Sequence, residues 1–465
     1  MLFSSIPFLF YFLPLVLILY FLVPKGLKNT VLLLFSLVFY GWGEPIYVLL
    51  MIVSIILYYS YGLAIARCRE FRWKKLWLMV SVITGIGLLG VFKYADFLIG
   101  SVNGLLGTHI PMLKLPLPIG ISFYTFQCVS YIIDVYRGNA QVQKNPISFG
   151  AYVSLFPQLI AGPIIRYADV ARELDERMTT WEDILYGVRR FLIGLAKKIL
   201  LANNFGQLIE IFRGADQQSV LFFWMYAVAF MLHIYFDFSG YSDMAIGLGR
   251  IFGFHFIENF NYPYLSKSVS EFWRRWHMSL GSWFRDYVYI PLGGNRVSKV
   301  RWIFNILAVW MLTGLWHGAS WNFVLWGLLF AAVLLIEKWI PRLQNLPSFL
   351  RHGYVLLVVM LSFVLFNATD LKQAGSDFAS LFGFAGLPAA SGETWYYLRS
   401  YGILFLIGFV GTTPLLRNLC RRLEQGHIGG KLLAVLEPLV LIGILLLCSA
   451  YLVDGSFNPF LYFRF

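Results

Sequence analysis

Long apolar segments separated by short polar loops run through most of this chain. A helix that crosses the hydrocarbon core of a membrane needs about 20 apolar residues, because that core is about 30 Å thick and each residue adds about 1.5 Å. We expect the first such segment to be retained as a helix, because it lacks the basic region and the small-residue cleavage site of a signal peptide. The predicted spans are 6–23, 30–41, 46–66, 76–95, 117–136, 218–236, 302–317, 320–340, 353–368, 398–416, 432–452 and, more weakly because it carries charged residues, 239–256.

Three regions break this pattern. The segment 144–180 is rich in proline, glycine and charge, and bent polar backbone at membrane depth is tolerated only where protein buries it or a cavity adjoins it. It is predicted to form a re-entrant turn. The segment 181–212 is a long helical pattern with four central basic residues, predicted to lie at the membrane interface. The segment 257–295 is too polar to span and too aromatic for a solvated loop.

The composition agrees with a membrane protein. The 465 residues are 59% hydrophobic and 13% charged, whereas a soluble domain is about half apolar and about a quarter charged. This excludes a cytosolic enzyme, a secreted disulfide scaffold and a disordered protein. The four cysteines are scattered without a CxxC pair, so neither disulfides nor a zinc site is expected. We predict an all-α polytopic membrane protein with a single membrane-embedded domain over residues 1–465.

The net charge of +13 changes this picture in one respect, because it orients the helices. Loops rich in Lys and Arg stay on the cytoplasmic side of a membrane, and 67–75, 291–301 and 417–431 are such loops. Counting twelve spans from them places both termini outside the cytoplasm. The cytoplasmic loops account for the positive charge, so we expect no nucleic acid partner.

His317 stands where one apolar segment passes into the next. Titratable side chains inside a membrane bundle are costly and are functional candidates by default, and imidazole can accept and return a proton near neutral pH. Gly314 and Gly318 flank it and allow close approach of another backbone or a thin ligand. The alternative is a structural histidine that donates to a backbone carbonyl.

A second histidine, His277, lies in the polar aromatic segment 270–296. This segment is predicted to form an interfacial helix on the cytoplasmic side, followed by a turn at 293–295. Arginine side chains suit phosphate recognition, although Trp and Arg also anchor proteins to lipid headgroups. The candidate donor-binding residues of this platform are Trp273, Arg274, Arg275, Trp276 and Arg285.

Platform and buried histidine together suggest acyl transfer within a membrane. A phosphate-bearing donor would dock on the platform and place its reactive end near His317, where a base activates the acceptor away from bulk water. No metal-binding, Gly-rich phosphate or nucleophile-elbow motif is present in the sequence. Further polar residues, of which some line a cavity or tie helices together, are Asp237, Ser239, Asp243 and Asn322.

Several motifs make the chain resemble the membrane-bound O-acyltransferase family, in its bacterial branch of the alginate O-acetyltransferase membrane subunit. Two of them hold the histidines: FWRRWHMSL at 272–280 and LTGLWHG at 312–318. The motifs fall within residues 1–340, and 341–465 are expected to add only C-terminal transmembrane helices. The other motifs are MLFSS at 1–5, LPIGISFYTFQ at 117–127, FPQLIAGP at 156–163, FDFSGYSDMA at 236–245 and WFRDYVYIPLGG at 283–294.

The resemblance implies a ring of tilted helices around a funnel, located in the bacterial inner membrane. It implies that His317 matches the buried catalytic histidine of the family and that His277 matches its second, upstream histidine. It further implies acetyl-CoA as a cytoplasmic substrate, with no bound cofactor. The acetyl group would pass to an extracytoplasmic partner of the SGNH type that modifies a polysaccharide.

Two other functions stay open from the sequence. A D-alanyl transferase of teichoic acid modification shares the histidines and uses a carrier-protein thioester as its donor. A polysaccharide or lipid exporter without catalysis would instead line its pathway with Asp237, Asp243 and His233. For these three side chains the simpler interpretation is a structural network between helices.

Overall fold

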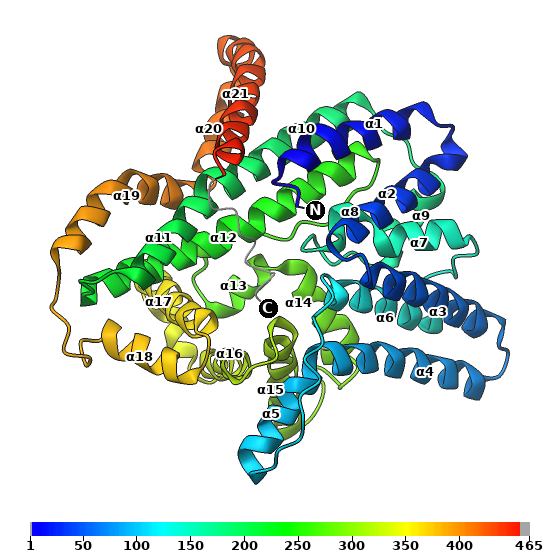
Figure 1. Cartoon of the computed structure of the whole chain (residues 1–465), viewed down its shortest axis with the longest axis horizontal. Helices are drawn as coiled ribbons and strands as arrows, with labels where there is room; N and C mark the ends of the chain where they lie inside the picture. Colours follow the sequence, from blue (N-terminus) through cyan, green and yellow to red (C-terminus); the bar gives the residue numbers. More distant parts are fainter. Residues whose placement is uncertain (1, 456–465) are drawn as a thin grey trace. The chain divides into compact units, whose positions relative to one another are not determined.

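The computed structural model describes residues 2–455, and within that range the chain forms helices joined by turns and coils, with no β-strand. The contacts between residues divide it into two units, and Figure 1 labels the helices along the chain. Unit 1 comprises Met1–Phe191 and Ser242–Ile257, and unit 2 comprises Leu192–Tyr241 and Glu258–Phe465. Helices α10 (Trp181–Ala196) and α12 (Val220–Ile251) each contribute residues to both units.

Unit 1 is built around aromatic side chains from its first helices. The rings of Phe8, Phe12 and Phe39 meet Phe156 with centroid separations of 6.2, 5.4 and 5.6 Å. The remaining elements of this unit are η1 (Phe8–Phe12), α1 (Leu13–Leu22), η2 (Lys25–Leu27), α2 (Lys28–Gly43), α3 (Tyr47–Arg67), α4 (Phe71–Leu89), η3 (Gly90–Tyr94), α5 (Ala95–Leu106), α6 (Ile121–Arg137), α7 (Pro146–Ser154), α8 (Phe156–Leu159) and α9 (Tyr167–Asp175).

The region predicted as a re-entrant turn is bent and buried. Helices α7 and α8 are separated by Leu155 alone, and a tight turn follows α8 before α9 begins. Every residue from 151 to 165 is buried. The irregular backbone is therefore covered by protein, as bent backbone at membrane depth requires.

Unit 2 holds both histidines singled out in the sequence. The helical pattern predicted for 181–212 is confirmed, since α10 continues through a π-turn into α11. Two pairs of helices, α15 with α16 and α20 with α21, lie side by side (Figure 1). The other elements of this unit are η4 (Lys197–Ala202), α11 (Asn203–Gly214), η5 (Pro263–Leu265), α13 (Val269–Arg275), α14 (Met278–Phe284), η6 (Arg285–Tyr289), α15 (Lys299–His317), α16 (Trp321–Trp339), η7 (Pro341–Asn345), α17 (Ser348–Asn367), α18 (Leu371–Leu381), α19 (Gly392–Gly411), α20 (Leu415–Glu424) and α21 (His427–Val453).

Two glycines bring α15 and α16 unusually close. A Cβ atom on Gly314 would collide with the carbonyl oxygen of Phe323, and one on Gly327 would collide with that of Trp310. Small residues permit such backbone contact between membrane helices. The close crossing fixes the end of α15, and therefore His317, against the first turns of α16.

The predicted number of twelve spans is too high. Among residues 2–455, six helices are long and apolar enough to cross a membrane, or seven if the bent pair α19 and α20 counts as one span. The predicted spans 218–236 and 239–256 are one continuous helix, α12. The sequence suggested a break because 237–240 is polar, but these four residues are all buried, so their polar groups meet protein rather than lipid. Six spans would leave both termini on the same side of the membrane and seven would separate them, so the placement of the C-terminus outside the cytoplasm stays a prediction.

Candidate functional site

His317 ends α15 inside an aromatic enclosure. Its side chain is 6% exposed, and the backbone leaves the helix at Gly318 in an extended conformation. The imidazole ring lies 5.2 Å from the ring of Trp326 on α16 and 5.3 Å from that of Phe366 on α17, centroid to centroid. These two helices therefore enclose a buried imidazole in an apolar setting.

His277 occupies the break between α13 and α14. Its backbone has a φ of 45°, a left-handed conformation that few residues other than glycine adopt and that Asn, Asp and His tolerate best. This conformation turns the ring inward, where it is 2% exposed and meets the ring of Phe238 on α12 edge to face at 4.6 Å. The continuous interfacial helix predicted for 270–296 is thus wrong, whereas the predicted turn at Gly293 and Gly294 is confirmed by their positive φ.

The two histidines lie together although forty residues separate them in the sequence. Their ring centroids are 6.5 Å apart. Burial lowers the pKa of His277 well below its usual range, and the neighbouring His317 lowers that pKa further. His277 is consequently a neutral imidazole near pH 7.

Asn259 was not anticipated from the sequence. Its side-chain Oδ1 lies 3.1 Å from His277 Nδ1 and accepts a hydrogen bond of 2.9 Å from Ser279 Oγ. Its backbone carbonyl accepts the N–H of Met278 at 3.0 Å, which holds the break between α13 and α14 in place. An asparagine in a loop carries no sequence signal for a contact with a histidine 18 residues later, so only the fold reveals this one.

Two indole N–H groups add donors to this enclosure. Among the residues that the structure describes, the buried Nε1 atoms of Trp273 and Trp326 find no hydrogen-bond acceptor. The two rings are 5.6 Å apart, and Trp326 is also in contact with His317. A buried donor without an acceptor costs about 1–3 kcal/mol, so these groups are suited to a bound molecule that brings an acceptor oxygen.

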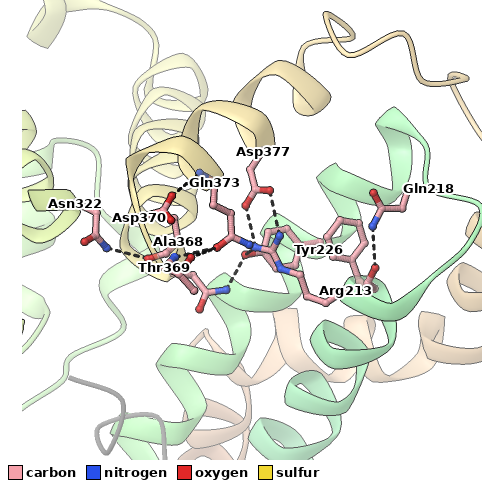
Figure 2. A network of polar contacts seen from close by, with 11 residues as sticks. Arg213, Gln218, Tyr226, Asn322, Ala368, Thr369, Asp370, Gln373 and Asp377 are labelled. Carbon is pink, nitrogen blue, oxygen red and sulfur yellow. Dashed lines mark hydrogen bonds and ion pairs between the residues drawn. The ribbon is translucent and has the colours of Figure 1, made fainter. Parts of the chain in front are cut away.

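Asn322, singled out in the sequence, belongs to a polar network in unit 2 (Figure 2). Its Nδ2 donates to the carbonyl of Ala368 at 2.9 Å, directly beyond the end of α17. The neighbouring Asn367 donates to Tyr226 at 2.6 Å, and Tyr226 in turn accepts from Arg213 at 2.7 Å. An ion pair of 2.8 Å between Arg213 and Asp377 completes this group (Figure 2). The network ties α11, α12, α17 and α18 together around the start of α16.

The acidic residues of α12 are engaged in ion pairs. In unit 2, Asp237 is 1% exposed and pairs with Lys198 of η4 at 2.5 Å. Ser239 is buried two residues later. In unit 1, Asp243 pairs with Arg190 of α10 at 2.8 Å. These contacts agree with the interpretation of a structural network between helices.

The structure separates the members of the predicted platform. Trp276 is 3% exposed and is packed among aromatic rings of the core, including Phe260 at 5.0 Å. Arg275 pairs with Glu271 at 2.8 Å, and Arg285 pairs with Asp286 at 2.6 Å. Arg274 lines a pocket of about 270 Å³, to which Glu271 also contributes.

Basic side chains dominate the charge of this pocket. Lys267, Arg274, Lys338 and Arg351 line it, together with two glutamates. One of these, Glu337, is 7% exposed and accepts the backbone N–H groups of Val269 and Ser270 at 2.6 and 3.1 Å, which anchors the first turn of α13. Three of the four cations were missed in the sequence because they lie on separate loops and helices that only the fold brings together.

Comparisons with known proteins identify relatives of this chain over the region that holds the two histidines. A model of the membrane-bound O-acyltransferase family matches residues 139–370, which include both histidines and Asn259. A protein of Azotobacter vinelandii described as probable alginate O-acetylase is 37% identical over 500 aligned positions that cover the whole of both chains. The chain belongs to the membrane-bound O-acyltransferase family.

Two other relatives of this membrane-bound O-acyltransferase align with different shares of its chain. The peptidoglycan O-acetyltransferase of Helicobacter pylori is 33% identical over 83% of this chain and 81% of its own length. The teichoic acid D-alanyltransferase of Bacillus subtilis is 31% identical over 56% of this chain and 69% of its own.

Family membership establishes an acyltransferase enzyme, and the apolar helices establish a multi-pass membrane protein. Among residues 2–455, no three His, Cys, Asp or Glu side chains gather into a group that would hold a metal ion.

Proposed function

We propose that this acyltransferase moves an acetyl group from cytoplasmic acetyl-CoA toward the O-acetylation of an extracellular or cell-surface polysaccharide. The observation that carries the proposal is the buried pair of His277 and His317, 6.5 Å apart within the part of the chain that matches the family. Relatives named for O-acetylation match most or all of the chain.

His317 is the proposed base or acyl-relay residue. Acyl transfer requires that an acceptor hydroxyl lose its proton as its oxygen attacks the acyl carbon, and imidazole is suited to take that proton. The surrounding rings of Trp326 and Phe366 keep water from the thioester. His277 lies beside this position and would orient the donor or the His317 ring.

Of the residues predicted to bind the donor, Arg274 is the one that lines a pocket, and we place the donor there. Coenzyme A carries phosphate groups, and four cationic side chains surround this pocket. Trp273 links it to the histidines, because it follows Ser270 and precedes Arg274 on α13 and its ring contacts Trp326. A donor held at Arg274 would therefore reach toward His317 along α13 and α16.

The D-alanyl transferase is the second candidate. The relative of that name matches 56% of this chain, whereas the probable alginate O-acetylase matches all of it. This difference favours O-acetylation and a free coenzyme A thioester. An SGNH-type partner on the outer side of the bacterial inner membrane would then receive the acetyl group and pass it to the polymer.

A donor-choice experiment tests the proposal. The purified protein in proteoliposomes is given radiolabelled acetyl-CoA or a D-alanyl carrier-protein thioester, together with an SGNH-type acceptor protein. Covalent transfer from acetyl-CoA is the expected result. Transfer from the carrier protein alone would support the D-alanyl function, and label that crosses without covalent transfer would support an exporter.

A further inference from the structure

The hydrogen bonds of Asn259 determine which atom of its side chain faces His277. Asn259 is fully buried, and its Oδ1 accepts the backbone N–H of Ser279 at 3.3 Å. A backbone N–H can only donate. The atom at this position must therefore be the amide oxygen, because the amide nitrogen would place two donors against each other.

The identity of this atom fixes the proton on the imidazole. An amide oxygen can only accept, so at 3.1 Å the Nδ1 atom of His277 must carry the hydrogen. In a neutral imidazole the other nitrogen is then an acceptor. Among the residues that the structure describes, the buried Nε2 atom of His277 has no hydrogen-bond partner.

We propose that Asn259 is a positioning residue that holds His277 in the Nδ1–H form, so that Nε2 accepts a hydrogen bond from an N–H or O–H group of the bound substrate. This inference rests on the proposed function for the identity of the substrate. It assigns His277 the role of a neutral acceptor, distinct from the proton transfer at His317.

The environment of His277 supports a neutral acceptor. The ring of Phe238 on α12 covers one side, and Trp316 on α15 lies 5.7 Å away. Among the described residues, His317 on α15 is a titratable group that faces His277. Ser279 Oγ, 3.5 Å from Nδ1, faces it from α14, so the contacts on the Nδ1 side are polar but uncharged.

Substituting Asn259 with Asp tests the inference through a pH profile. A carboxylate accepts the same hydrogen bonds, but its charge stabilises the imidazolium and raises the pKa of His277. The imidazolium carries a hydrogen on Nε2 and cannot accept. Asn259→Asp should therefore keep its activity at alkaline pH, while the acidic limb of kcat/KM moves to higher pH by about one unit or more.

A second variant and a control separate this role from a structural one. Asn259→Leu removes the acceptor, and we expect a fall in kcat on the order of 10²-fold, since a wrongly protonated imidazole is a severe defect in catalysis. Asn305 is also buried but donates to the carbonyls of Leu292 and Gly294 away from the histidines. Asn305→Asp should leave the pH profile of the remaining activity unchanged.

Nitrogen-15 NMR of histidine-labelled native protein, with His277→Gln for assignment, provides a readout that needs no activity. A protonated Nδ1 and an unprotonated Nε2 are expected at neutral pH. A protonated Nε2, or an Asn259→Asp profile that coincides with the native one, would overturn the inference. Absence of acyl transfer by native protein that shows the expected spectrum would count against the proposed function alone.

Discussion

Single side chains set the chemistry that this site can support. His277 and His317 are both buried among aromatic rings, and for His277 this burial lowers the pKa and favours the uncharged imidazole. Both residues were predicted from the sequence. His317 stood out because imidazole in an apolar segment is costly and therefore informative, and His277 because of its polar aromatic segment and the motif that resembles the family. Asn259 and Trp326 were not predicted, because an asparagine in a loop and a tryptophan in an apolar helix are ordinary in sequence and gain meaning only from their neighbours.

The indole of Trp326 is expected to stabilise the transition state. Its N–H has no acceptor among the described residues and its ring adjoins His317, so it is placed to meet the oxygen that gains charge when the acyl carbon is attacked. Trp326→Phe should lower kcat by about 10²-fold with little change in donor KM, as measured in steady-state acyl-transfer assays. Trp310→Phe is the matched control from the same aromatic cluster, and equal losses in the two variants would contradict the assignment.

Arg274 is expected to act on donor binding rather than on the chemical step. Its side chain lines the basic pocket on α13, and a cation there would contact phosphate in the ground state and in the transition state alike. Arg274→Ala should raise the apparent KM for acetyl-CoA by about tenfold and leave kcat within a few fold. Arg285→Ala, which removes an exposed arginine paired with Asp286, serves as the control. An unchanged KM for acetyl-CoA in Arg274→Ala would show that this pocket does not bind the donor.

Pairs of helices position these side chains. The close crossing of α15 and α16 follows from glycines that are visible in the sequence, and the ends of both helices were predicted to within a few residues. The break between α13 and α14 was not predicted, because it depends on the left-handed backbone of His277 and on contacts with Asn259. Local patterns of apolar residues cannot reveal a break that a distant loop holds in place.

The crossing predicts a sharp difference between two glycines. A side chain on Gly314 would collide with the backbone of Phe323, whereas a Cβ on Gly353 of α17 would meet nothing within 4 Å. Gly314→Val should destabilise the protein by about 1–3 kcal/mol, and Gly353→Ala should be neutral or slightly stabilising. Thermal unfolding in detergent measures both, and equal stability of the two variants would show that the helices do not cross this closely.

At the scale of the whole molecule, the sequence predicted an all-helical membrane protein correctly but overestimated the number of its spans. Apolar content is a property of composition, whereas the number of crossings depends on which polar runs are buried inside protein. The buried ion pair of Lys198 and Asp237 shows why spans are hard to count from sequence. Both charged residues lie in helices, η4 and α12, and not in a loop. The single domain predicted for residues 1–465 stays a prediction.

Orientation in the membrane can be tested with a cysteine that the chain already carries. Cys420 is exposed on α20, within the basic segment 417–431 that is expected to face the cytoplasm. A membrane-impermeant maleimide should label it only after the cells are permeabilised. The experiment uses a Cys68→Ser background, because Cys68 is partly exposed whereas Cys128 and Cys448 are buried, and Cys420→Ser in that background provides the control. Labelling of Cys420 in intact cells would reverse the proposed orientation of this segment.

The most direct test of the account is the acetyl-transfer rate of His317→Ala in proteoliposomes, compared with that of His427→Ala, an exposed histidine at the start of α21. His317→Ala should insert and fold but lose transfer by about 10³-fold or more, because the proposed base that takes the proton from the acceptor is removed. His427→Ala should transfer acetyl groups at the native rate. Full acetyl transfer by His317→Ala would contradict the account.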